Sequence, residues 1–127
     1  MNFAWVGVGG IIGALMRFQL SRWIGEKLAV SFPLATLFIN VSGAFLLGYL
    51  TRNITLWIHD SAAAEHAMLL LGTGLCGAYT TFSTFNYELV ILARERRIGT
   101  ALVYFLSSVL FGFAACAIGL YGLPVSR

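Results

Sequence analysis

The segment "GLCGAYTTFSTFNYE", residues Gly74 to Glu88, lies inside a long apolar run. The run extends from about Ala67 to Ala93, and as one straight helix it would be about 40 Å long. The hydrocarbon core of a bilayer is only about 30 Å thick, so such a helix would be strongly tilted or broken. Glycine and β-branched threonine are weak helix formers, and both gather in the middle of the run. The pattern favours a helix that is broken between about Gly77 and Thr81.

The composition of the whole chain is that of an integral membrane protein. Of its 127 residues, 59% are hydrophobic and 10% are charged, whereas a soluble domain carries about a quarter charged residues. Four apolar runs are long enough for helices of about 20 residues that cross a bilayer, and they are far longer than barrel strands. We expect an all-α membrane protein in which residues 1–127 form one four-helix transmembrane domain, with spans at about 3–25, 34–50, 67–93 and 99–123.

The composition also disfavours several classes of function. Cys76 and Cys116 both lie in apolar runs and suggest neither a disulfide framework nor a metal site. The net charge of +3 comes without a basic stripe, so nucleic acid is not an expected partner. His59 and His66 lie in the second connector, and no nucleophile–base pair or metal-ligand cluster is recognisable. We therefore do not expect an enzyme.

Small residues recur at spacings that let helices approach closely in lipid. Gly9 and Gly13 form a G-x-x-x-G pair in the first span. These glycines could tighten a single four-helix unit, or they could join two chains. The polar groups within the spans need partners that four helices can hardly supply, which favours a dimer of eight helices. The supplementary glycines are Gly43, Gly48, Gly72, Gly112 and Gly119.

The distribution of lysine and arginine predicts how the chain is oriented. With four spans, both termini and the second connector share one side of the membrane, and that side carries Arg52 and Arg127. The positive-inside rule places this side outside the cell and the more basic first and third connectors in the cytoplasm. The basic residues of these two connectors are Arg22, Lys27, Arg94, Arg96 and Arg97.

Polar side chains at membrane depth are costly and therefore mark functional candidates. Arg17, in the first span, could snorkel to the interface along its aliphatic stem or have a buried role. Asn40 lies in the middle of the second span. Its amide could bond a neighbouring helix, or it could turn its NH₂ donors toward an anion in a pore. Spacing alone favours the structural option for Asn40.

The third span carries the most informative polar groups. A break near Gly77 to Thr81 would leave carbonyls without helical partners, and such carbonyls can ligate a cation such as Na⁺. Phe82 and Phe85 follow at i and i+3, on one face. They could pack against lipid or other helices, or their electropositive ring edges could cradle an anion. Glu88, at the far end of the segment, is expected near the interface.

In the fourth span, Tyr104 and Ser108 lie one turn apart on the same face. Hydroxyls in a helix can bond back to the carbonyls of their own helix, which is the expected role of Ser107. A row of donors along an ion path is the alternative.

Taken together, these residues resemble a known family. The ordered set "GALMRF" (residues 13–18), "TLFINVSGAFLLG" (36–48) and "GLCGAYTTFSTFNYE" (74–88) is similar to the Fluc (CrcB) fluoride channels over essentially the whole chain. The resemblance implies an antiparallel, dual-topology homodimer, or a heterodimer of two opposed homologues, in the cell inner membrane. Such dimers export toxic fluoride passively through two pores, and a Na⁺ is buried at the dimer centre.

The resemblance also implies a role for each matching residue. The positions implied for the fluoride pore are Asn40, Phe82, Phe85, Ser83, Thr84 and Tyr104. The backbone carbonyls of Gly77 and Thr80 from both subunits would hold the Na⁺. Arg17 would lie in the pore vestibule, although Phe18 stands where a tryptophan is common.

The chemistry of fluoride agrees with this set of groups. Fluoride holds its water strongly, so a selective pore must replace that water with donors at close quarters, weakly enough for the ion to leave. Hydroxyls, an amide and ring edges meet this requirement better than a ring of lysine or arginine. The bias in lysine and arginine departs from a dual-topology chain, so fixed and dual orientation both stay open.

The rival function is a small proton-coupled multidrug exporter, which shares the length, the four helices and the antiparallel dimer. That mechanism needs a membrane-embedded carboxylate, usually in the first helix. Here the first helix offers Arg17 and no acid before Glu26.

Overall fold

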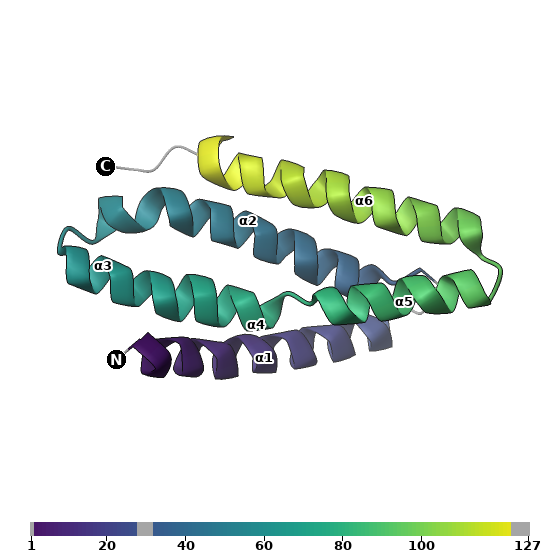
Figure 1. Cartoon of the computed structure of the whole chain (residues 1–127), viewed down its shortest axis with the longest axis horizontal. Helices are drawn as coiled ribbons and strands as arrows, with labels where there is room; N and C mark the ends of the chain where they lie inside the picture. The colour runs from purple at the N-terminus through teal and green to yellow at the C-terminus, as the bar shows by residue number, and fades with distance from the viewer. Residues whose placement is uncertain (1, 28–31, 123–127) are drawn as a thin grey trace.

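The structure, a computed structural model, describes residues 2–27 and 32–122, and the regular structure within them is helical (Figure 1). The all-α class expected from the sequence is confirmed. The start of α1 and the end of η2 lie toward the same end of the bundle. In chain order the elements are α1 (Asn2–Lys27), α2 (Leu34–Trp57), α3 (Ser61–Met68), η1 (Leu69–Cys76), α4 (Gly77–Tyr79), α5 (Phe82–Arg94), α6 (Ile98–Ala117) and η2 (Ile118–Gly122).

The helices form four roughly parallel rows, and one of these rows is interrupted. In Figure 1, α3, η1, α4 and α5 follow one another along a single row. The α1 helix packs against η1 and α4, whereas α2 packs against α6 and η2, and α5 packs against α6. The two halves of the interrupted row therefore have different neighbours.

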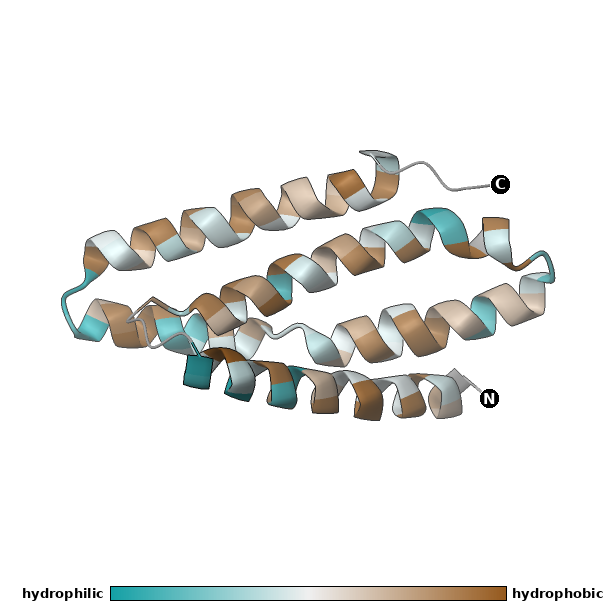
Figure 2. Ribbon diagram, turned by 180° about the vertical axis from the view of Figure 1, so that it is seen from behind, coloured by the Kyte–Doolittle hydropathy of each residue, from teal (hydrophilic) through white to brown (hydrophobic). Residues whose placement is uncertain are grey.

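Three of the described helices are long and apolar enough to cross a membrane: Phe3–Lys27, Leu34–Ile54 and Ile98–Gly122. Their outer surfaces carry large exposed apolar side chains, such as Ile11 on α1 and Leu110 on α6. Figure 2 shows that most strongly hydrophilic residues gather near the ends of helices and in the connections. The chain is a multi-pass membrane protein.

The third span is broken, as the sequence favours, and is not a single tilted helix. Helical structure runs continuously from Ser61 to Tyr79 and resumes at Phe82. Between these points the backbone is extended, with φ −78° and ψ 159° at Thr80 and φ −146° and ψ 120° at Thr81. The first half includes a π-helical stretch, η1, over Leu69–Cys76. The break lies at the β-branched pair, at the end of the interval expected from the sequence.

Two helices extend beyond the runs defined by hydrophobicity. The α3 helix begins at Ser61, because the Asp60 carboxylate accepts a hydrogen bond from the backbone N–H of Ala63 at 3.1 Å and caps it. The α2 helix continues to Trp57 rather than ending near residue 50. Polar side chains bond back to this part of α2, since Asn53 donates to the Tyr49 carbonyl at 2.9 Å. Hydrophobicity alone misses such turns because it does not register hydrogen bonds from polar side chains to the backbone of the helix.

Most of the glycines in this pattern pack within one chain, whereas Gly112 meets nothing within 4 Å, and the dimer stays a prediction. A Cβ on Gly9 or Gly13 would collide with the backbone of η1 at Leu70 or Leu75. Gly48 and Gly119 likewise face each other's helices, and a Cβ on Gly48 would lie 2.5 Å from the Cys116 carbonyl oxygen. These glycines bring the backbone of α1 into contact with that of η1, and the backbone of α2 into contact with that of the end of α6 and of η2.

Candidate functional site

The break in the third segment is held by the side chain of Asn40 on α2. The Nδ2 of Asn40 donates to the Thr81 carbonyl at 2.9 Å, and its Oδ1 accepts from the Thr81 N–H at 2.8 Å. One side-chain amide therefore satisfies both the N–H and the carbonyl of Thr81. We call these two hydrogen bonds the Asn40–Thr81 pair. An amide nitrogen carries two hydrogens, so Asn40 retains one donor for a further acceptor. The structural role that spacing favours for Asn40 is observed, and it does not use up the amide.

The hydroxyls of Thr80 and Thr81 form hydrogen bonds with backbone groups. Thr80 donates from Oγ1 to the Cys76 carbonyl at 2.9 Å, and its backbone N–H donates to the same oxygen at 3.0 Å. The Thr81 Oγ1 accepts from the Thr84 N–H at 3.2 Å and caps α5. Each half of the broken helix is thereby closed by its own threonine.

In an unbroken helix, the carbonyls of Gly77 and Thr80 would each accept a hydrogen bond from a backbone N–H four residues later. Here those two N–H groups donate to side chains instead. The helical partner of the Gly77 carbonyl is the Thr81 N–H, which instead donates to Asn40. The helical partner of the Thr80 carbonyl is the Thr84 N–H, which instead donates to Thr81 Oγ1. Gly77 is exposed, and a side chain there would meet nothing within 4 Å. Carbonyl oxygens released in this way are hard ligands of the type that an alkali cation takes.

A cavity of about 420 Å³ opens beside the break. Its walls come from α2 and from the first half of the third segment, and they include Asn40, Cys76, Gly77 and Thr80. Because non-helical backbone at membrane depth must be buried or line a cavity, this is the setting that the extended residues require.

A second hydroxyl contact joins α2 to the end of α4. The Ser42 Oγ donates to the Ile39 carbonyl at 3.1 Å and lies 2.9 Å from the phenolic oxygen of Tyr79. Because the serine proton is directed to Ile39, the Tyr79 hydroxyl donates to Ser42. The sequence reasoning did not identify either residue. Tyr79 could have been recognised from the sequence, because it is a polar aromatic residue directly before the threonine pair and inside the third apolar run.

Phe82 and Phe85 lie at the start of α5 but have different surroundings. Their ring centroids are 6.4 Å apart. Phe85 is buried, with its ring 5.0 Å from that of Tyr104 in an edge-type arrangement. Phe82 is 74% exposed on the surface of the single chain. One ring therefore belongs to the bundle, while the other projects from it.

Tyr104 connects α6 to the far part of α5. Its side chain is fully buried, and its hydroxyl donates to Oε1 of Glu88 at 2.8 Å. Glu88 is partly buried, and this hydrogen bond joins its carboxylate to α6. One turn further along α6, the buried Oγ of Ser108 has no hydrogen-bond partner among the described residues. The sequence analysis did not connect Glu88 to the site. Its spacing of three residues from Phe85 could have indicated that the two side chains share a helix face.

The remaining residues implied by the resemblance lie at the edge of this group. Ser83 and Thr84 are exposed beside Phe82. Arg17, on α1, is half-buried and forms no ion pair within residues 2–27 and 32–122. The structure thus brings Asn40, the break and α5 together, and it leaves the polar face of α5 open.

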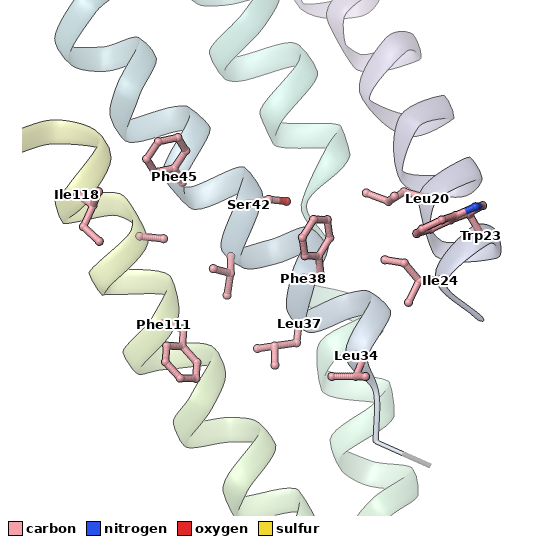
Figure 3. Close-up of a pocket in the computed structure, with 12 residues that line it drawn as sticks. Leu20, Trp23, Ile24, Leu34, Leu37, Phe38, Ser42, Phe45, Phe111 and Ile118 are labelled. Atoms are coloured by element: carbon pink, nitrogen blue, oxygen red, sulfur yellow. The ribbon is translucent and has the colours of Figure 1, made fainter. Parts of the chain in front are cut away.

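A larger groove of about 860 Å³ lies between α1, α2 and α6 (Figure 3). Phe38 and Phe111 are among the side chains along it, and Ser42 contributes a hydroxyl. The other lining residues are apolar apart from the indole N–H of Trp23. Two isolated donors in a long apolar groove are too few to replace the water of an anion along a path.

The chain matches known proteins over nearly its whole length. Residues 4–120 match the family described as "CrcB-like protein, Camphor Resistance (CrcB)". A protein of Moorella thermoacetica named fluoride-specific ion channel FluC 2 is 46% identical over 119 residues, which are 94% of this chain and 93% of that protein. One of Acidobacterium capsulatum, named fluoride-specific ion channel FluC, is 42% identical over 94% of each chain. A third, FluC 2 of Bacillus cereus, is 42% identical over 90% of this chain and 93% of its own.

Proposed function

The chain belongs to the CrcB family, and from this premise we propose that it is a fluoride-selective channel of the bacterial inner membrane. It is a channel and not an enzyme, and it lets toxic fluoride leave the cell passively. The observation that carries the proposal is the Asn40–Thr81 pair, because it puts an amide with a remaining donor beside a helix break inside an apolar bundle.

The groups around the break can replace the water of a small anion. Asn40 offers its second Nδ2 hydrogen, and the exposed Ser83 and Thr84 offer hydroxyls along α5. The rings of Phe82 and Phe85 offer electropositive edges without a formal charge. Several weak neutral contacts in sequence let an ion enter and leave, which conduction requires. Tyr104 belongs to the same path and holds Glu88 through its hydroxyl.

A second copy of the chain, in the antiparallel orientation, would complete the path; an opposed homologue is the alternative partner. The support for a partner is the exposure of Phe82, Ser83 and Thr84, which leaves one wall of the candidate path unbuilt in a single chain. Two chains related by a two-fold axis would build two equivalent pores. The close helix contacts at Gly9, Gly13, Gly48 and Gly119 do not support this proposal, because they lie within one chain.

A structural Na⁺ at the dimer interface fits the backbone at the break. The carbonyls of Gly77 and Thr80 have lost their helical donors to side chains, and Gly77 is exposed. Two such carbonyls from each of two chains would supply four oxygen ligands of the type Na⁺ prefers. The cation would hold the two breaks together at the centre of the dimer.

Arg17 is proposed to lie in the vestibule of the pore. Its half-buried guanidinium is not committed to an ion pair in the described residues, so it can raise the local concentration of an anion without closing the path.

The function is tested with purified protein in liposomes loaded with fluoride or chloride. We expect fluoride efflux without a proton gradient and a far slower efflux of chloride. Fluoride efflux at background, together with uptake of a lipophilic cation driven by a pH gradient, would favour the multidrug exporter instead. Phe82→Ile is expected to abolish fluoride efflux in dimers that remain intact. Unchanged efflux in this variant would remove Phe82 from the path.

A further inference from the structure

The turn between α5 and α6 has a closed backbone and a basic surface. The N–H of Arg97 donates to the Leu92 carbonyl at 2.9 Å, and the N–H of Arg96 donates to the Ala93 carbonyl at 3.1 Å. This pair of bonds is the Schellman arrangement, which normally has glycine at the residue in the left-handed conformation. Leu92 is buried together with Phe85 and Tyr104, so the turn is attached rigidly to the core beside the candidate path.

The left-handed position of this turn is occupied by Arg96. Its φ is 60°, and it is the one non-glycine residue with a positive φ among the described residues. A side chain with a Cβ is strained in this conformation, whereas glycine is not. Glycine would therefore suit the backbone better, and the arginine at this place needs a reason other than the fold of the turn.

The charges of Arg94 and Arg96 are not balanced by an ion pair within the part of the chain that the structure describes. Nη1 of Arg97 lies 4.0 Å from Oε1 of Glu95, at the outer limit of an ion pair. Arg94 and Arg96 are exposed, and neither forms an ion pair within the described part of the chain. The turn thus presents two exposed guanidinium groups beside one weak pair.

The turn also lies where a lipid headgroup would be. The α6 helix begins directly after it, and Ile98 and Leu102 on the first turns of α6 are both more than half exposed. In a membrane-spanning helix, such exposed apolar side chains face acyl chains. The guanidinium groups one turn before them are therefore at the depth of the phosphates.

We propose that the turn from Arg94 to Arg97 is a binding site for the phosphate of an anionic phospholipid headgroup. Arginine suits this ligand because its planar guanidinium can donate two parallel hydrogen bonds to one phosphate. The left-handed backbone at Arg96 directs its side chain away from the path it would take in a continuing helix. The site is independent of ion conduction, since none of its residues belongs to the candidate pore.

The test measures lipid binding to the purified protein in a non-ionic detergent by native mass spectrometry. Phosphatidylglycerol and phosphatidylcholine with identical acyl chains are compared, and inorganic phosphate is added in a third arm. We expect the wild-type chain to retain phosphatidylglycerol preferentially, and free phosphate at millimolar concentration to leave it bound. Each arginine near a membrane surface contributes a factor of about five to anionic lipid binding. The double variant Arg94→Gln/Arg96→Gln should therefore bind phosphatidylglycerol roughly 25-fold more weakly.

Two further variants separate the headgroup contact from the fold of the turn. Arg96→Gly keeps the left-handed backbone without strain but should lose about fivefold in affinity. Arg96→Lys keeps the charge but not the two parallel hydrogen bonds, so its affinity should lie between those of the wild type and Arg96→Gly. Arg22→Gln is the matched control, since Arg22 is exposed on α1 and paired with Glu26 at 3.3 Å. Equal affinity of the wild-type and double-variant chains for phosphatidylglycerol would overturn the proposal. Equal retention of the two lipids, or displacement by inorganic phosphate, would also overturn it.

Discussion

Between Ser61 and Gly122 the described chain leaves the helix at Thr80–Thr81 and at Glu95–Arg97, and the two interruptions are stabilised in different ways. The turn at Glu95–Arg97 is closed by its own backbone and is exposed. The break at Thr80–Thr81 relies on side chains, one of which comes from Asn40, 41 residues away in the chain. Water can satisfy a turn at the membrane surface, whereas a break among apolar helices needs a partner for each backbone group.

Replacing Asn40 with aspartate should remove the support of the break at Thr80–Thr81 and have the largest effect. The carboxylate can still accept from the Thr81 N–H, but it cannot donate to the Thr81 carbonyl, and a buried carbonyl left unpaired costs about 1–3 kcal/mol. A negative charge at this point also repels an anion. We expect fluoride efflux to fall to the level of protein-free liposomes and thermal stability in detergent to fall with it.

The matched control is Gln19→Glu, the same amide-to-acid change at an exposed position of α1. It should conduct like the wild type. Efflux that survives Asn40→Asp would show that the amide serves the fold of the break and not the ion.

A second variant tests the first half of the broken segment through its contact with α1. A Cβ at Gly13 would collide with the Leu75 backbone of η1. Because the obstacle is backbone and not a movable side chain, Gly13→Ala should destabilise the chain by about 1–3 kcal/mol. Denaturant unfolding in micelles, followed by circular dichroism, measures the change.

Gly7→Ala is its control, because a side chain at Gly7 would meet nothing within 4 Å. Alanine is the better helix former, so this variant should be neutral or slightly stabilising. A similar loss of stability in both variants would mean that the close crossing of α1 and η1 is absent in the membrane.

The cap of α5 tests the second half of the broken segment. Thr81→Val keeps a β-branched residue suited to the extended backbone but removes the oxygen that accepts from the Thr84 N–H. Loss of such a cap costs about 1 kcal/mol, to be measured by the same unfolding experiment. Thr51→Val is the comparison, since the Thr51 hydroxyl donates to the Leu47 carbonyl of its own continuous helix. A penalty as large at Thr51 as at Thr81 would contradict a special role for the cap.

The smallest expected effect belongs to the exposed turn and has the opposite sign. Arg96→Gly relieves the positive φ and should stabilise the chain in non-ionic detergent, by up to about 1 kcal/mol. Arg94→Gly, which puts glycine into the last helical turn of α5, should destabilise it by about 1 kcal/mol. Equal losses in both variants would show that the turn does not hold its left-handed residue in solution.

Much of the fold was accessible from the residue pattern. The length of the third apolar run and the glycines and threonines within it predicted a break, and the break lies at Thr80–Thr81. The helix ends at Trp57 and Ser61 were not predicted, because hydrophobicity does not register capping and back-bonding by polar residues. The glycine pairs were recognised as contact surfaces, but spacing cannot say which helix a glycine faces.

For the candidate site, the sequence predicted the positions but not their environments. The positions Asn40, Phe82, Phe85 and Tyr104 were singled out by residue type and by resemblance, and that choice remains a prediction. Their separate environments were not accessible, since nothing in the local pattern distinguishes a buried Phe85 from an exposed Phe82. The partnership of Tyr104 with Glu88 joins two helices and cannot be read along one of them.

Local hydrophobicity and helix propensity are enough to specify that the chain is helical, lies in a membrane and interrupts its third span. Long-range contacts establish that Asn40 supplies both partners of Thr81, that four glycines pack within a single chain and that Phe82 is left outside. The reason is physical: lipid gives apolar helices no preferred neighbour, so backbone contacts and hydrogen bonds between distant segments select the arrangement.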